Sequence, residues 1–70
     1  MKMFMVINNT DGELVHKDRN QMYIWKGKNE YRTMNSDEVA MLVATSPQFV
    51  KNDWITIHEV NKEWAISAHK

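Results

Sequence analysis

The chain has 70 residues, which is near the lower limit at which one hydrophobic core keeps a domain folded, so we expect a single domain over residues 1–70. The charges of nine basic and nine acidic residues cancel, which argues against an acidic mimic of DNA. The chain therefore has no net charge that would attract it to nucleic acid or to a membrane. There is no cysteine, so disulfides and thiolate metal sites are excluded. No apolar run approaches the roughly 20 residues of a membrane span, and we expect a cytoplasmic protein that does not bind membranes.

The N-terminal segment is predicted to be a strand with two apolar faces. Met3, Met5 and Ile7 alternate with Phe4 and Val6. This pattern favours an inner strand, or a strand whose second face meets another molecule. Residues 9–12 then predict a turn, with Gly12 at positive φ and with Ile7 opposite Leu14 in a first hairpin.

Residues 21–34 predict a second hairpin, with Gly27 in a tight turn. In that register Tyr23 lies opposite Arg32, and Trp25 lies opposite Glu30, as an exposed ladder of aromatic and charged side chains. The other face is expected to be core and consists of Met22, Ile24, Tyr31 and Thr33.

The stretch from Asn35 to Phe49 predicts the helix. Asn35 is a suitable N-cap, Glu38 completes a capping box, and Pro47 ends the helix. The expected apolar face consists of Val39, Leu42 and Val43, whereas Met41 points in roughly the opposite direction.

Residues 53–70 predict a third hairpin, in which a turn at Asn61-Lys62 sets Ile57 opposite Ile66. The expected fold is therefore α+β, with a mostly antiparallel sheet of five to six strands, built from three hairpins in the order ββββαββ and packed on one helix. One helix covers only one face of such a sheet. The uncovered face is expected to carry Phe4, Val6, Val15, Tyr23, Trp25, Trp54 and Val60, a patch that points to a partner.

The sequence contains no pattern typical of an enzyme. His16, His58 and His69 are expected on exposed strand faces, and no serine lies in a nucleophile motif. We therefore expect no catalytic residue, no metal site and no cofactor.

The second hairpin supplies the candidate binding residues. Aromatic and basic side chains are enriched where proteins bind other proteins, and they also form platforms for single-stranded RNA. The candidate partner-binding residues are Tyr23, Trp25, Lys26, Lys28 and Arg32, followed by Trp54 and Met41. Protein binding is the first hypothesis, an RNA-binding module that uses the hairpin 21–34 is the second, and a homodimer that buries the uncovered face is the third.

The layout of the chain is similar to that of a known class of small proteins. The matching segments are FMVINNTDGELV, YIWKG, NSDEVAMLVA and WITIHEVNKEWAIS. In size and layout the chain resembles single-domain phage and prophage proteins of the anti-CRISPR or anti-defence type. This resemblance implies a non-enzymatic inhibitor that occupies a surface of a host protein or ribonucleoprotein in the host cytoplasm. It assigns no functional residue.

Overall fold

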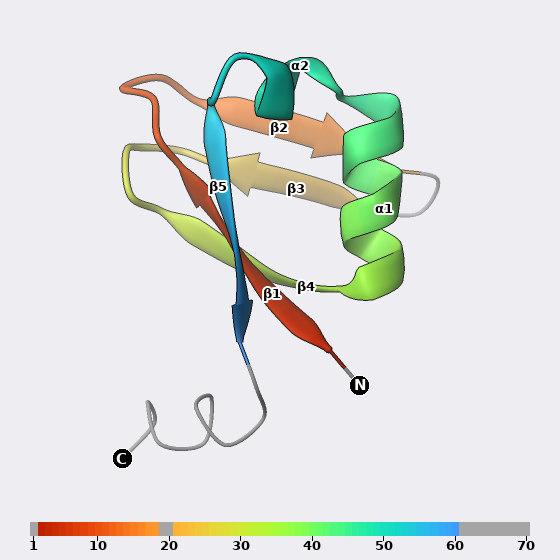
Figure 1. Cartoon of the computed structure of the whole chain (residues 1–70). Coiled ribbons are helices and arrows are strands. Elements are labelled where there is room, and N and C mark those ends of the chain that lie inside the picture. The colour runs from red at the N-terminus through yellow and green to blue at the C-terminus, as the bar shows by residue number, and fades with distance from the viewer. Residues whose placement is uncertain (1, 19–20, 61–70) are drawn as a thin grey trace.

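The computed structural model describes residues 2–18 and 21–60, which form five strands and two helices (Figure 1). In chain order these elements are β1 (Met3–Asn8), β2 (Leu14–Lys17), β3 (Met22–Trp25), β4 (Tyr31–Asn35), α1 (Ser36–Thr45), α2 (Gln48–Lys51) and β5 (Ile55–Val60). The protein is therefore α+β with antiparallel strands. No helix within the described ranges is both long enough and apolar enough to cross a membrane.

The strands form two small sheets. Sheet A has the order β4-β1-β5, in which Val6 lies opposite both Arg32 and Ile57. Sheet B pairs β2 with β3, so that Trp25 lies opposite Leu14. Because β1 is the central strand of sheet A, the inner position predicted from its two apolar faces is confirmed.

The predicted strand pairing is wrong for the first two hairpins. β1 pairs with β4 and β5 instead of β2, and β3 pairs with β2 instead of β4. The connections after β1 and β3 carry the chain from one sheet to the other. Neither glycine has a positive φ, and the left-handed conformation falls instead on Asn29 and Asp53.

One buried asparagine holds two of these connections together. Asn8 has no solvent exposure, and its amide donates to the carbonyl oxygens of Gly12 (2.9 Å) and Gly27 (3.0 Å). Its Oδ1 accepts from both the backbone N–H and the hydroxyl of Thr10, each at 2.8 Å. We call this group the Asn8 junction.

The start of the helix follows the prediction. Asn35 Oδ1 accepts from the N–H of Glu38, and Glu38 Oε1 accepts from the N–H of Asn35, both at 2.9 Å, which completes the capping box. α1 ends before Pro47, and the short helix α2 follows. On the predicted apolar face Leu42 is buried, but Val43 is exposed.

Both sheets contribute to one hydrophobic core, together with α1 and α2. Its buried residues are Val6, Leu14, Trp25, Met34, Leu42, Phe49 and Ile55. In Figure 1, α1 lies along one side of the sheets, and α2 lies above them. The strand of the third predicted hairpin is present as β5, whereas its turn and its returning strand lie outside the described residues.

Candidate functional site

Trp25, the first candidate in the predicted binding surface, lies in the core. It has no solvent exposure, its indole N–H donates to the carbonyl oxygen of Val6 (2.9 Å), and its ring meets Phe49 edge-on at 6.4 Å. The expectation that Trp25 and Val6 lie on an uncovered face is therefore wrong. The predicted hairpin pairs β3 with β4, whereas the structure pairs it with β2, and the inner and outer faces of β3 are exchanged.

The opposite face of the predicted hairpin is correspondingly exposed. Met22 is 59% exposed, Tyr31 is 53% exposed, and Thr33 is exposed as well, although all three were expected in the core. Ile24 is half-buried.

Tyr23 is engaged inside the protein. Its ring stacks on His16 at a centroid distance of 5.9 Å, and its hydroxyl contacts the carboxylate of Glu38 and the side-chain amide of Gln21. A phenol has one proton to donate, and the charged carboxylate is the stronger acceptor. Burial, together with the bond to Glu38, raises the pKa of Tyr23 to about 12.

The basic candidates lie apart from these aromatic rings. Lys26 and Lys28 are exposed in the connection between β3 and β4. Arg32 is half-buried in sheet A, and its guanidinium donates to Glu30 at 2.6 Å. This hydrogen bond to Arg32 lowers the pKa of Glu30. The RNA-binding hypothesis requires aromatic rings beside the lysines on which bases stack, and the rings of Tyr23 and Trp25 do not lie there.

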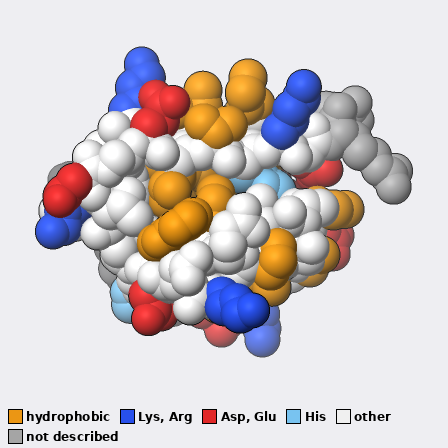
Figure 2. Space-filling model, turned by 90° about the horizontal axis from the view of Figure 1, so that it is seen from above, with side chains coloured by type: hydrophobic (Ala, Val, Ile, Leu, Met, Phe, Trp, Pro, Cys, Tyr) orange, Lys and Arg blue, Asp and Glu red, His pale blue; other side chains and the backbone are white. Residues whose placement is uncertain are grey.

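Trp54 and Met41 lie on other parts of the surface. Trp54 is 36% exposed and packs on Phe49 with ring centroids 6.0 Å apart, next to the exposed Val50 of α2. Figure 2 shows several separate groups of hydrophobic side chains on this end of the molecule, in the middle and toward the edges, where charged side chains also lie. Met41 is half-buried on α1. The structure therefore does not bring the predicted binding residues together on one surface.

One surface left uncovered by the described elements is the second face of sheet A, which we call the open face; the outer face of sheet B, with the exposed Val15 and Met22, is another. Alternation along the strands and the register of their pairing place Met3, Met5 and Ile7 in the centre of the open face on β1. Its flanks consist of Tyr31 and Thr33 on β4 and of Thr56, His58 and Val60 on β5.

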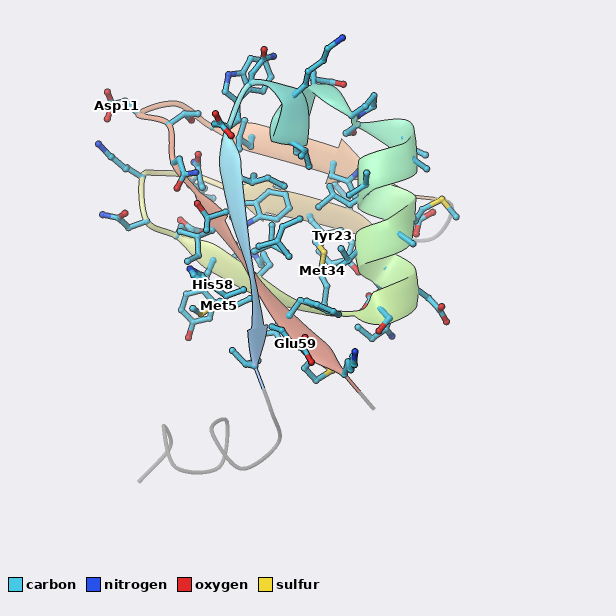
Figure 3. All side chains as sticks on the ribbon, in the orientation of Figure 1. Met5, Asp11, Tyr23, Met34, His58 and Glu59 are labelled. Carbon is cyan, nitrogen blue, oxygen red and sulfur yellow. The ribbon has the colours of Figure 1, made fainter. Side chains whose placement is uncertain are left out.

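The two sides of sheet A differ clearly in Figure 3. Met34 points toward α1 and the core, whereas Met5 and His58 point to the other side of the sheet. None of the side chains of the open face is an acid, a lysine or an arginine. The sequence argument for an uncovered sheet face identified a real feature, but it assigned the wrong residues of β1 to that face. The sequence signal that identifies the open face is the alternating apolar stripe of Met3, Met5 and Ile7 on a strand whose other face is also apolar.

Within the described part of the chain, no three side chains of the metal-binding types gather closely enough to hold an ion. No protein-family model, no curated protein and no solved structure matches the chain.

Proposed function

We propose that this protein is a small non-enzymatic binding protein that uses the open face of sheet A to occupy an apolar surface of a protein partner. The observation that carries the proposal is the half-buried apolar stripe of Met3, Met5 and Ile7 on the central strand, flanked on β4 by the exposed Tyr31. Soluble proteins rarely leave a contiguous apolar patch unused.

The composition of the open face supports a protein partner. Methionine side chains are flexible and polarisable, so they adapt to the shape of a partner, and tyrosine is enriched at interface centres. Tyr31 is 53% exposed and lies beside this stripe, opposite Ile7. Because the face lacks formal charges, it suits a neutral apolar surface better than the phosphates of a nucleic acid.

The role that we propose for this binding is inhibition. A small domain that covers a functional surface of a host protein or ribonucleoprotein blocks that surface without any chemistry of its own. The size and layout of the chain, which resemble phage anti-defence proteins, support this role and the host cytoplasm as its setting.

Partner capture with matched variants tests the proposal. The immobilised protein is incubated with host lysate, and the retained proteins are identified by mass spectrometry. Tyr31→Thr and Met5→Thr remove apolar surface from the open face and keep a residue that favours strands. Val15→Thr makes a similar change at an exposed apolar residue of sheet B and is the control.

We expect one partner to be retained by the native protein and by the Val15→Thr variant, and to be lost from both open-face variants, with unchanged circular dichroism in all cases. Equal retention by all variants would contradict the assignment to the open face. Selective loss in Trp54→Ala would move the site to the exposed patch beside α2.

The homodimer is the second candidate, and the same observation favours it. Two copies of the open face can stack without bringing acids, lysines or arginines together, because none lies on that face. Light scattering decides between the two, because a dimer that dissociates in Tyr31→Thr would make the open face a self-interface. A monomer at high micromolar concentration would exclude this alternative.

A further inference from the structure

His16 lies between sheet B and the C-terminal end of α1. The residue is 1% exposed, and its ring stacks on that of Tyr23 with an angle of 19° between the planes. Its Nδ1 lies 3.3 Å from the hydroxyl oxygen of Ser46, the residue that caps the end of α1. This contact ties the end of the helix to strand β2.

The other ring nitrogen of His16 finds no partner in the described part of the chain. Nε2 is buried, and no hydrogen-bonding group among residues 2–18 and 21–60 reaches it. A neutral imidazole has one donor and one acceptor nitrogen, so the neutral ring leaves one group unsatisfied. A protonated ring has two donors, and the second would be a buried N–H carrying part of a positive charge without an acceptor.

The groups around the ring do not supply that acceptor. On β3, Tyr23 faces the ring as a neutral phenol, and the nearby carboxylate of Glu38 is already bonded to the Tyr23 hydroxyl and to the N-terminus of α1. From α1 the ring meets the neutral hydroxyl of Ser46 and the negative end of the helix dipole, which favours a cation modestly. Asp18, at the end of β2, attracts a positive charge on the ring.

Burial outweighs these attractions. The desolvation of the ring lowers the pKa of His16 below its ordinary value, although Asp18 acts in the opposite direction. The folded protein therefore holds His16 neutral at a pH at which an unfolded chain would already bind the proton.

We propose that His16 is an acid-sensitive latch between sheet B and the end of α1, so that protonation of its buried ring releases the segment from Ser46 to α2. The geometry indicates which part moves. Beyond Ser46 the chain turns at Pro47 into α2, where Phe49 packs edge-on against Trp25. Loss of the Ser46 contact removes the side-chain bond that holds this turn to sheet B.

The direction of the pH effect follows from linkage. The unfolded state binds a proton at His16 near pH 6.5, and the folded state does so only at lower pH. Between these values the unfolded state holds more protons, so the free energy of unfolding falls as the pH falls. The stabilisation is fully present above about pH 7.5 and is lost progressively below about pH 6.5.

The first test uses the native protein and needs no variant. The ring signals of His16 are followed by NMR between about pH 8 and about pH 5, together with hydrogen exchange of the Ser46 amide corrected for the intrinsic pH dependence of exchange. We expect His16 to titrate below the ordinary histidine value of about 6.5, and Ser46 to lose protection as His16 takes its proton. Titration of His16 at or above that ordinary value would overturn the proposal.

The second test compares His16→Phe with His58→Phe, the same change at an exposed strand position. In the native protein and in the His58→Phe variant, we expect the unfolding equilibrium constant to rise by up to about tenfold per pH unit below about pH 6.5. In His16→Phe this rise should disappear between about pH 7.5 and about pH 5.5, above the range in which carboxylates titrate. If His16→Phe does not fold, His16→Gln serves as the non-titrating variant. An unchanged pH profile in the folded variant would overturn the latch.

Discussion

Asn8 and His16 are the two buried polar side chains of the described chain, and they are satisfied to very different degrees. The side-chain amide of Asn8 makes four hydrogen bonds within the Asn8 junction, so both of its N–H donors and both lone pairs of its oxygen have a partner. Within residues 2–18 and 21–60, His16 makes one long hydrogen bond, and its Nε2 has no partner. A buried polar group whose hydrogen bonds are all made fixes its surroundings in one arrangement. A buried group with an unmade hydrogen bond holds its surroundings less firmly, and protonation destabilises it further.

The largest effect is expected at the Asn8 junction. Asn8→Ala removes one hydrogen bond from each of the carbonyl oxygens of Gly12 and Gly27 and takes the acceptor from the N–H of Thr10. The two carbonyl oxygens keep only their longer bonds, from the Thr10 hydroxyl (3.1 Å) and the Glu30 N–H (3.3 Å). We expect the free energy of unfolding to fall by about 3 kcal/mol, which is a large fraction of the stability of so small a domain. Urea denaturation measures this change.

The neighbouring asparagine provides the control for that experiment. Asn9 also uses its amide group to bond Asp53 and Thr56, but it does so at the surface. Asn9→Ala should therefore cost less than about 1 kcal/mol, because water replaces the lost partners. A similar loss for both variants would show that burial does not distinguish the two sites.

A smaller loss is expected at the other contact between α1 and sheet B. Tyr23→Phe keeps the ring stacked on His16 but removes the hydroxyl that bonds Glu38. We expect a loss of about 1 kcal/mol, since the site is only half-buried and water reaches the carboxylate.

The native protein provides an independent check at alkaline pH. Because the pKa of Tyr23 is raised to about 12, the folded state keeps its phenol proton where the unfolded state loses it. Stability is therefore fully present below about pH 10 and falls as the pH rises through about 12. Tyr23→Phe should reduce this alkaline dependence, and an unaltered dependence would contradict the assigned bond.

The smallest effect is expected for His16→Phe at about pH 7.5. The change removes a long contact to Ser46, and it also removes a buried nitrogen that has no partner. These terms nearly cancel, so the free energy of unfolding should change by less than about 1 kcal/mol in either direction. A loss comparable to that of Asn8→Ala would show that His16 is as well satisfied as Asn8.

The sequence predicts the local features of this fold well. The capping box of Asn35 and Glu38 lies within one helical turn, and the structure contains it as expected. The break at Pro47 and the inner position of β1 also follow from residues close together in the chain. In each case the cause is steric or involves hydrogen bonds between near neighbours.

Strand pairing and burial are harder to predict because they depend on distant segments. The residues on both sides of β3 suit a core or a surface, so the identity of the partner strand decides that Trp25 is inside and Met22 is outside. His16 is expected on an exposed strand face because histidines are common on such surfaces, and it is buried instead. Nothing in the sequence marks Asn8 as a junction between two connections, since three of its four hydrogen bonds are to backbone groups that most residues provide.

The position of β1 between β4 and β5 also has a consequence for how the protein folds. The first strand finds both of its partners far along the chain, and the last described strand, β5, completes the sheet. Contacts of such long range form only after long loops have closed, and loop closure costs conformational entropy before any contact stabilises the chain. We therefore infer a folding rate slower than that of helical domains of equal length. A chain that ends before Ile55 would leave one edge of β1 unpaired and both of its apolar faces poorly covered, which makes such a fragment prone to aggregation.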